Sequence, residues 1–276
     1  MLLLPTGFFQ PSVSPLLLDG IAATAAAYSV RKLRAGYVGA ALRVRRDSDN
    51  AELDIGFTGD ALDTVSLLAF VGGASGWVSN WYDQSGNARD AAQATPGNQF
   101  RIVGTGTLDT DGGLPILVQS AQVQTAAIPA SVFAGMSSST AVCAFKQVSG
   151  GDGGWWSIGS ASATQTHTPF TDGNAYEQYL ATSRFSFGPY AQPYTRSVHT
   201  AHNTGAALSV FRCGNAIGTA AAVTFTATPS TNTTACGYQL TTASRFEVIF
   251  SAAALSTADR QKVERSMGTY YAITVA

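Results

Sequence analysis

Charged side chains are scarce in this sequence. Lysine, arginine, aspartate and glutamate make up 12% of the 276 residues, and the formal net charge is −1. This is roughly half of the charged share that is usual in soluble domains. Without a basic excess the chain lacks the surface that nucleic acids require, so we expect no nucleic-acid partner. A surface this poor in charge also predicts coverage by other protein, and hence a homo-oligomer.

Long apolar runs are missing as well. No stretch reaches the roughly 18 apolar residues that a membrane-spanning helix needs, so we expect no membrane partner. The N-terminus has no basic residues, and Pro5 interrupts its short apolar run, which is unlike a secretory signal. The proline-interrupted apolar stretch over residues 1–18 instead predicts an extended docking arm.

Cysteine is rare, which excludes a disulfide framework. The three cysteines, Cys143, Cys213 and Cys236, are an odd and sparse set. We expect three buried thiols in a chain made in a reducing cytosol. A single bridge between Cys213 and Cys236 is the alternative if their strands are neighbours.

Metal-binding patterns are weak. The three histidines, His167, His199 and His202, have no cysteine or carboxylate at zinc-binding spacing, so we expect no metal site. Asp109 and Asp111 precede two glycines, which predicts a hairpin turn, with a calcium loop as the alternative. We therefore expect no cofactor.

Hydrophobic residues make up 45% of the chain, enough for a large core. The alanine-rich residues 19–34 predict a helix, and alternation over 41–45 and 53–57 predicts two strands. Residues 60–71 predict a short helix that ends at Gly72. Residues 19–99 are thus expected to form a small helical and β cassette that packs on the following domain.

From residue 100 onward, short apolar stretches alternate with clusters of Gly, Asp, Ser and Asn, which is typical of a β-sandwich. The predicted strands are 101–103, 114–118, 140–147, 155–158, 185–187, 196–202, 207–213, 222–227 and 246–250. Ser256 is predicted to cap a final helix whose apolar face carries Val263, Met267 and Tyr270.

Two parts of this second half resemble a known fold. Residues 246–250, followed by 255–264 and Tyr270-Tyr271, resemble the closing strand and helix of concanavalin A-like, laminin-G-type domains. Residues 140–146, 155–159 and 207–214 are similar to the inner strands of that fold. The resemblance implies a mainly β fold: a concanavalin A-like jelly-roll sandwich over residues 100–276, with a C-terminal helix. The fold hosts lectins, hydrolases and adhesion modules, so it does not fix a function.

The first hundred residues resemble the N-terminal part of family 54 arabinofuranosidase catalytic domains. The matching stretches are 27–33, 37–39, 44–51 and 81–87, and the Tyr-Asp-Gln-Ser-Gly turn at 82–86 is the most specific piece. The same cassette is similar to one in phage tail and other virion proteins, where it precedes a laminin-G-like sandwich without catalysis. The second resemblance implies a component of a bacteriophage particle.

Catalysis of glycoside hydrolysis needs two carboxyl groups close together, one of them held protonated. The chain has four glutamates, Glu52, Glu177, Glu247 and Glu264, and only Glu177 lies in an aromatic, polar stretch. The cysteine-rich region that carries the family 54 nucleophile finds no match in this sequence. We therefore expect that the chain is not an enzyme. If it is one, Glu177 and Asp172 are the pair to test.

Aromatic residues supply the best binding pattern. The glycan-binding candidates are Trp155, Trp156, Tyr176, Tyr179 and Tyr190, because sugars stack their C–H faces on such rings. In alternating strands, however, half of these rings belong to the core, and a contact between subunits would use the same residue types. Core or interface packing is therefore the alternative.

The turn Asp83-Gln84-Ser85-Gly86 is expected to be structural. An aspartate in such a turn usually accepts hydrogen bonds from backbone N–H groups close by. Ligation of an ion or a sugar by Asp83 is the alternative.

Taken together, the sequence predicts a structural protein of a bacteriophage virion: a tail fibre, a tail tip or a capsid decoration. It would be made in the host cytoplasm and located on the virion. Its partners would be other virion proteins, further copies of itself (a trimer is one option) and a glycan of the host surface. The alternatives are a glycoside hydrolase or depolymerase of the arabinofuranosidase type, and a free carbohydrate-binding module.

Overall fold

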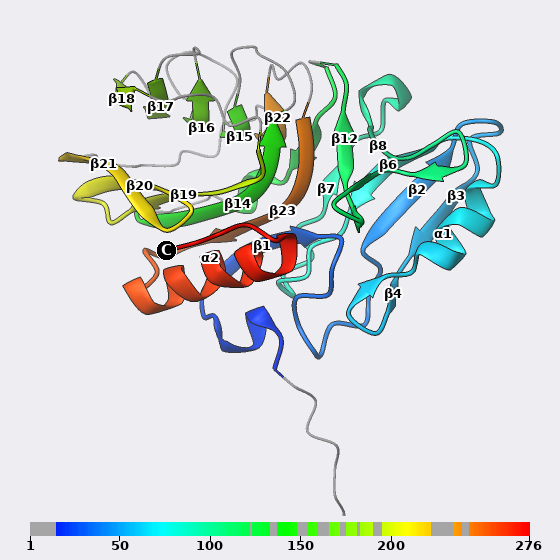
Figure 1. The fold of residues 1–276 in the computed structure, drawn as a ribbon, viewed down its shortest axis with the longest axis horizontal. Helices are drawn as coiled ribbons and strands as arrows, with labels where there is room; N and C mark the ends of the chain where they lie inside the picture. The colour runs from blue at the N-terminus through cyan, green and yellow to red at the C-terminus, as the bar shows by residue number, and fades with distance from the viewer. Residues whose placement is uncertain are drawn as a thin grey trace, which may run out of the picture.

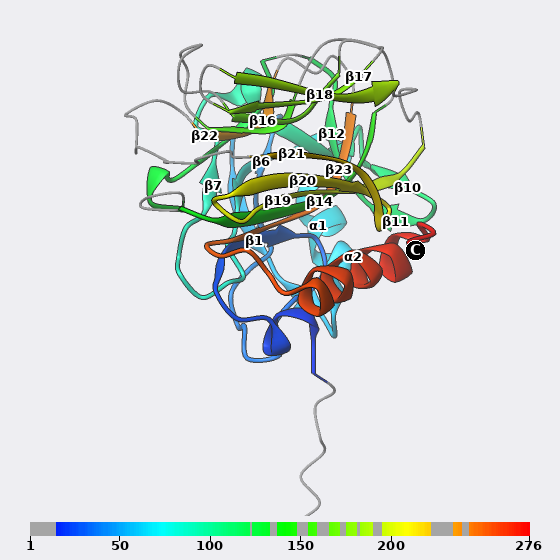
Figure 2. The same cartoon turned by 90° about the vertical axis from the view of Figure 1, so that its left-hand side faces the viewer.

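The computed structural model describes residues 15–121, 123–132, 137–147, 154–158, 166–171, 175–180, 183–189, 195–221, 234–238 and 243–276. For residues 154–189 and 234–238 it is the backbone that is described. The described strands pair antiparallel throughout, and the described part contains two α-helices. The mainly β, jelly-roll-like sandwich that the sequence predicted is therefore confirmed. Figures 1 and 2 show three stacked layers: an outer sheet, a central sheet, and the C-terminal helix on the far side of the central sheet.

The central sheet has the strand order β21–β20–β19–β14–β23–β1. Its strands are β21 (Asn215–Ala221), β20 (Ala207–Arg212), β19 (Ser197–Asn203), β14 (Ser139–Gln147), β23 (Ala243–Ser251) and β1 (Thr24–Ser29). A further strand, β12 (Leu117–Gln119), pairs with the first residues of β23, next to β1.

The outer sheet has the order β18–β17–β16–β15–β22–β13. Its strands are β18 (Ser183–Pro189), β17 (Ala175–Leu180), β16 (Thr166–Thr171), β15 (Gly154–Ile158), β22 (Thr234–Tyr238) and β13 (Ala126–Ile128). From β15 to β18 each strand pairs antiparallel with the next strand in the chain, so this part of the sheet is a simple meander.

An N-terminal group of strands connects the two sheets. Its core is β3–β2–β6, and the free edge of β6 pairs with β7 and β8. Because β7 pairs with β13 of the outer sheet and β8 pairs with β12 of the central sheet, both sheets are joined to this group. Its strands are β2 (Leu42–Arg46), β3 (Glu52–Ile55), β6 (Gly76–Trp81), β7 (Ala91–Ala92), β8 (Phe100–Gly104) and β9 (Thr107–Leu108).

Smaller elements complete the described chain. Two short hairpins pair β4 (Phe57–Thr58) with β5 (Ala61–Leu62) and β10 (Thr110–Asp111) with β11 (Leu114–Pro115). The 3-10 turns are η1 (Leu17–Gly20), η2 (Pro96–Asn98) and η3 (Ala130–Val132). The α-helices are α1 (Thr64–Val71) and α2 (Thr257–Tyr271), and no helix of the described part is long and apolar enough to cross a membrane.

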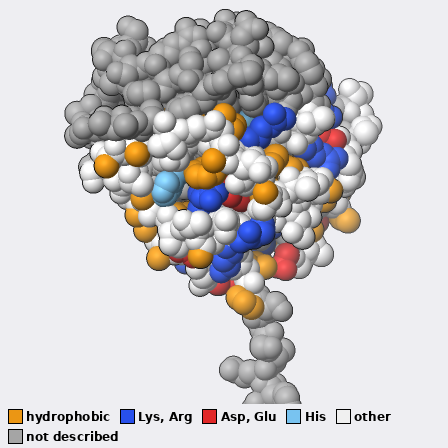
Figure 3. Space-filling model, turned by 60° about the vertical axis from the view of Figure 1, so that its left-hand side comes forward, with side chains coloured by type: hydrophobic (Ala, Val, Ile, Leu, Met, Phe, Trp, Pro, Cys, Tyr) orange, Lys and Arg blue, Asp and Glu red, His pale blue; other side chains and the backbone are white. Residues whose placement is uncertain are grey.

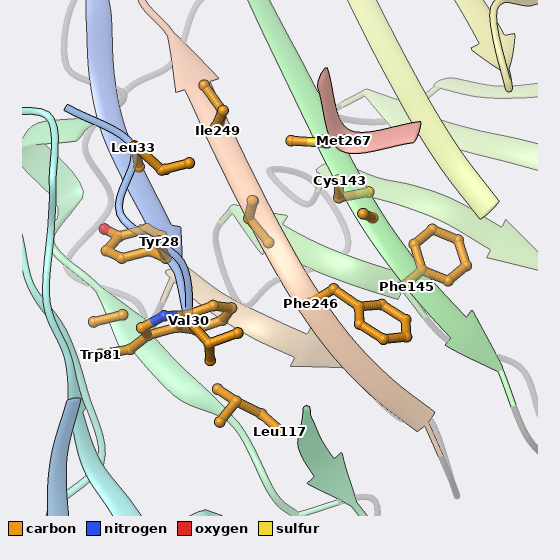
Figure 4. Packing of buried hydrophobic residues seen from close by; sticks show 14 of the residues in the cluster. Tyr28, Val30, Leu33, Trp81, Leu117, Cys143, Phe145, Phe246, Ile249 and Met267 are labelled. Atoms are coloured by element: carbon orange, nitrogen blue, oxygen red, sulfur yellow. The ribbon is translucent and has the colours of Figure 1, made fainter. Parts of the chain in front are cut away.

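The middle of the central sheet is covered on both faces. Every residue of β23 is buried, and so is all of β19 apart from its sixth position. A strand with one face in water would show alternating burial, so continuous burial indicates cover on both sides. Helix α2 packs on β14 and β19 and supplies one of these covers (Figure 2). The core runs without a break from Tyr28 and Trp81 to Phe246 and Phe145 (Figure 4).

Both α-helices begin within a few residues of the predicted position, and α1 ends at the predicted glycine. Helix α1 starts after Asp63, whose carboxylate accepts from Ser66 N, and it ends at Gly72, where φ is +61°. Helix α2 starts after Ser256, whose hydroxyl accepts from the backbone N–H of Asp259. These side chains satisfy N–H groups that the first turn of a helix leaves unpaired.

The helix predicted over residues 19–34 is wrong. The short turn η1 is followed by strand β1, which pairs antiparallel with β23 from Thr24 to Ser29. Alanine favours a helix in isolation, but tertiary pairing overrides that preference. Ala26 and Ala27 have no exposed surface, because small side chains let the strand lie close to its neighbours.

Other predicted segments differ in detail. The strand predicted over 114–118 is split into β11 and β12, and β13, β16, β17, β21 and β22 were not predicted. The strand predicted over 222–227 lies outside the described residues, as does most of the N-terminal arm. Leu17 and Leu18, at the end of that arm, are buried against the domain. The proposed division at residue 99 stays a prediction.

Figure 3 shows basic and acidic side chains scattered among uncharged atoms on the described part of one face. This is the sparse charge that the composition indicates.

Candidate functional site

Glu247 is committed to a buried ion pair. Its carboxylate accepts two hydrogen bonds from Arg31, at 2.7 Å from Nε and 2.9 Å from Nη2. Ser29 Oγ and Tyr271 OH donate to the same carboxylate at 2.9 and 3.2 Å. The Glu247 side chain has no exposed surface. Four donors therefore fix this carboxylate between β1, β23 and α2, away from solvent.

The ionised Glu247 carboxylate also affects the pKa values of its hydrogen-bond partners. Burial by itself would lower the pKa of Arg31, but the charge and hydrogen bonds of Glu247 outweigh it and raise that pKa. Burial, and then the charge of Glu247, raise the pKa of Tyr271 well above its ordinary value. Both partners thus keep their protons, and the cluster is a structural clamp.

Glu264 is equally enclosed. On α2 it accepts from Arg260 Nη1 at 2.7 and 2.6 Å and from Thr200 Oγ1 at 2.6 Å. The guanidinium of Arg260 lies 3.7 Å from the ring centroid of Phe211. Helix α2 is thereby tied to β19 and β20, and Glu264 is 0% exposed.

Glu52 is the opposite case, since it lies exposed on β3 in the N-terminal group. In the ladder it pairs with Arg45 of β2, next to the hairpin turn. It is remote in the fold from the β15–β18 meander (Figure 1). Of the four glutamates, this leaves Glu177 as the one whose position suits chemistry on a ligand.

Glu177 lies in the middle of β17, within the outer sheet. Its register partners are Phe170 on β16 and Ser186 on β18. Both flanking ladders contain a bulge close to it, between His167 and Phe170 on one side and between Ala175 and Tyr176 on the other. Bulges often lie next to active sites, where they re-aim side chains.

Asp172, the second carboxylate of the predicted pair, lies outside the described residues. In the sequence it follows Thr171 directly. Thr171 is paired with Tyr176, the residue before Glu177. The residues that directly precede the two carboxylates in the sequence are therefore cross-strand partners.

The register places two of the glycan-binding candidates on the face of Glu177. Tyr179 is two residues further along β17 and pairs with His167 of β16. His167 in turn pairs with Ser157 of β15, two residues from Trp155. Because residues two apart in a strand share a face, Trp155, His167, Tyr179 and Glu177 occupy one face.

The other candidates are separated from them. Trp156 and Tyr176 each neighbour a residue of that face in the chain, so they occupy the opposite face of the sheet. Tyr190 lies outside the described residues. The five rings therefore do not form one surface, and their roles in binding stay predictions.

The turn after β6 is held by buried hydrogen bonds. Asp83 accepts from the backbone N–H of Ala27, Ser85 and Arg89 at 2.8–3.1 Å, and from the hydroxyl of Ser85 at 2.7 Å. Gln84, with no exposed surface, bonds three backbone groups of the segment that follows β1. These contacts fasten the most specific piece of the sequence resemblance to the central sheet.

The carboxylates considered for calcium are engaged in ion pairs. Asp109 pairs with Arg101 at 2.8 Å, and Asp111 pairs with Arg196 at 2.9 Å and Lys146 at 3.3 Å. Burial of Asp111 would raise its pKa, but the hydrogen bond and charge of Arg196 lower it. Among the described residues, no three His, Cys, Asp or Glu side chains gather as a metal site would require.

The cysteines differ from the expected set. Cys143 is buried, but Cys213 is only half-buried and is a thiol, so the alternative of a Cys213–Cys236 bridge is wrong. Cys213 lies in the β20–β21 turn, where its φ is +48°.

Sequence patterns alone missed two features. The bond between Arg31 and Glu247 spans 216 positions and the bond between Thr200 and Glu264 spans 64, so no local motif indicates either contact. The shared face of Glu177, Tyr179 and His167 depends on the register of β16 and β17, and β16 was not predicted. The alternation in 175–180 is the pattern that could have revealed β17.

Comparison with known proteins gives a family. Residues 18–189 match the model of the alpha-L-arabinofuranosidase B catalytic domain. A crystal structure of an arabinofuranosidase complexed with arabinofuranosyl-alpha-1,2-xylobiose is similar, with a TM-score of 0.66, 16% identity and 91% of this chain covered. A glycoside hydrolase family 54 α-L-arabinofuranosidase soaked with a cyclic sulfate inhibitor has a TM-score of 0.66, 13% identity and the same coverage. The chain spans 63% of each of those structures. A search of curated proteins found no match.

These findings correct two expectations. The function as a bacteriophage virion protein and the conclusion that the chain is not an enzyme are both contradicted, because most of the chain matches a catalytic-domain model. The error came from requiring a cysteine-rich region around the catalytic glutamate. The expected homo-oligomer, host-surface glycan and location stay predictions. With 172 of 276 residues inside the match, the chain belongs to the family of alpha-L-arabinofuranosidase B catalytic domains.

Proposed function

We propose that this chain is a glycoside hydrolase that removes terminal α-L-arabinofuranosyl groups from a carbohydrate. The reaction breaks the bond between the anomeric carbon of the arabinose and the glycosidic oxygen. Water supplies the hydroxyl that ends on the anomeric carbon and the proton that ends on the leaving oxygen. The observation that carries the proposal is the family match over residues 18–189, which includes the whole β15–β18 meander.

We assign Glu177 as one of the two carboxyl groups of the reaction. Glu247 and Glu264 are buried and each is paired with an arginine, and Glu52 is exposed in the N-terminal group. Glu177 shares its face of the outer sheet with Trp155 and Tyr179, aromatic residues on which a furanose ring can stack. A glutamate-to-glutamine mutant of a family 54 α-L-arabinofuranosidase has been soaked with 4-nitrophenyl α-L-arabinofuranoside, which supports a glutamate as a central group in the fold.

Asp172 is our candidate for the second carboxyl group. The β16–β17 hairpin places its chain neighbour Thr171 opposite Tyr176, beside Glu177. The two groups must lie about 5–5.5 Å apart in an enzyme that retains the anomeric configuration and about 6.5–9.5 Å apart in one that inverts it. NMR of the first-formed arabinose anomer distinguishes the two outcomes.

The test is hydrolysis of 4-nitrophenyl α-L-arabinofuranoside, followed by the absorbance of released 4-nitrophenolate. We expect turnover by the purified chain, and a loss of about 10²–10⁴-fold in kcat for Glu177→Gln, because the variant keeps the shape but not the ionisable group. Glu52→Gln is the matched control and should keep wild-type turnover, since Glu52 lies on β3.

Two results would overturn the proposal. Absence of turnover by wild-type protein on this substrate and on arabinoxylan would refute the activity. Equal turnover by wild type and Glu177→Gln would refute the site. Circular dichroism and thermal unfolding of each variant separate a lost group from a lost fold.

A further inference from the structure

The outer sheet contains a single acid and a single guanidinium in its described strands. Across β13, β22, β15, β16, β17 and β18, the charged residues are Glu177 and Arg184 alone. Two charged residues spread over six strands need not be neighbours. Their relative position in the sheet can therefore indicate a shared role.

The register brings the two together. Glu177 of β17 pairs with Ser186 of β18, and Arg184 is two residues from Ser186 on the same strand. Arg184 itself pairs with Tyr179, which is two residues from Glu177. Arg184 is thus the diagonal neighbour of Glu177 on the same face. Diagonal neighbours in an antiparallel pair are about 7–8 Å apart, which is within reach of long side chains.

From this juxtaposition we propose that Arg184 is a positioning residue for Glu177 in the reaction. The inference rests on the proposed function, because it concerns the same site. A guanidinium can bind a carboxylate through two parallel N–H groups, which fixes its orientation as well as its charge. A nearby positive charge also favours the ionised form of a carboxyl group. On this proposal, the positive charge of Arg184 favours the ionised form of Glu177, which is the form in which a carboxyl group acts as a nucleophile or a base.

The position of Arg184 favours this role over a purely structural one. Arg31 and Arg260 pair with glutamates that are buried in the core, Glu247 and Glu264. Arg184 instead lies on the face that also holds Trp155, His167 and Tyr179. These are residue types that a sugar-binding surface uses.

The test compares Arg184→Gln with Arg184→Lys on 4-nitrophenyl α-L-arabinofuranoside. We expect Arg184→Gln to lower kcat by about 10²-fold with little change in KM, because misplacing a reacting group by about 1 Å costs that much. Arg184→Lys keeps the positive charge but lacks the two parallel N–H groups, so it should recover part of the lost kcat. Ser183→Ala is the matched control on β18, since Ser183 pairs with Leu180 and so lies on the opposite face.

A double mutant identifies the route by which Arg184 acts. If it acts through Glu177, Arg184→Gln should have little further effect once Glu177 is changed to glutamine. Full additivity of the two losses would overturn the inference, and so would wild-type kcat in Arg184→Gln or a loss confined to KM. If Arg184→Gln fails to fold, Arg184→Lys in the two backgrounds provides the same cycle.

The proposed function and this inference fail in different ways. An inactive wild type, or an active Glu177→Gln, refutes the proposed function and its site. An active wild type, an inactive Glu177→Gln and an unaffected Arg184→Gln refute the role of Arg184 alone.

Discussion

Replacing Gln84 by leucine should destabilise the whole domain. The Gln84 side chain is 0% exposed, and it accepts a hydrogen bond from Leu33 N at 2.8 Å. Its amide nitrogen donates to the carbonyl oxygens of Ser29 and Arg31, each at 3.0 Å. One side chain therefore satisfies three backbone groups of the segment that leaves β1.

Leucine has a similar volume but can make none of these bonds. Each buried backbone group left unsatisfied costs about 1–3 kcal/mol, and the added apolar surface returns about 1 kcal/mol. For the three groups together we therefore expect the free energy of unfolding to fall by about 2–8 kcal/mol. For domains of this order of size, that lowers Tm by about 4–32 °C.

The assay is urea unfolding followed by circular dichroism and tryptophan fluorescence. Gln261→Leu is the control, because the side chain of Gln261 is partly exposed on α2 and accepts an exposed hydrogen bond from Arg265. It should change the free energy of unfolding by less than about 0.5 kcal/mol. A cost below about 1 kcal/mol for Gln84→Leu, or equal costs for the two variants, would refute the reasoning.

Two further predictions concern charge and stability. Glu247→Gln should cost about 3–5 kcal/mol because it leaves Arg31 buried without its partner, whereas Asp54→Asn, which breaks the similar but exposed pair with Arg43, should cost less than about 1 kcal/mol. If the two variants lose the same free energy of unfolding in chemical denaturation, burial does not set the cost of breaking these pairs. Burial, and then a neighbouring arginine, lower the pKa of His199 well below its ordinary value. Between the folded and unfolded pKa of His199, the unfolded chain binds more protons than the folded chain. The contribution of His199 to stability should therefore fall by up to about 1.4 kcal/mol per pH unit as the pH drops below about 6.5, and it should stay level above that pH. His199→Phe should remove this contribution from the slope of unfolding free energy against pH, and an unchanged slope would show that His199 is not the group responsible.

The sequence revealed elements that local patterns determine. Helix α2 was predictable from Ser256 as its cap and from the spacing of Val263 and Met267, and β23 from its apolar run. Helix α1 was predictable because Gly72 ends it. In each case the residues that decide the element lie within the element or beside it.

Strand β1 was not predictable in this way. Its alanines favour a helix locally, and only pairing with β23, more than 200 residues away, makes it a strand. Pairing at that distance leaves no trace in a window of neighbouring residues. The same reason hides the bond between Arg31 and Glu247.

The candidate site was only half visible. Glu177 could be selected from the sequence, because it is the one glutamate in an aromatic, polar stretch. Which of the aromatic candidates share its face could not be decided, because that depends on the register of neighbouring strands. The sequence therefore treated Trp155 and Trp156 alike, although the sheet places them on opposite faces.

The binding position of an arabinofuranoside in crystals of the Glu177→Gln variant tests the central claim most directly. Crystals soaked with 4-nitrophenyl α-L-arabinofuranoside should show the intact glycoside against residue 177, on the face of the outer sheet that carries Trp155 and Tyr179. A glycoside seated on the opposite face, or on another part of the molecule, would contradict the assignment of Glu177.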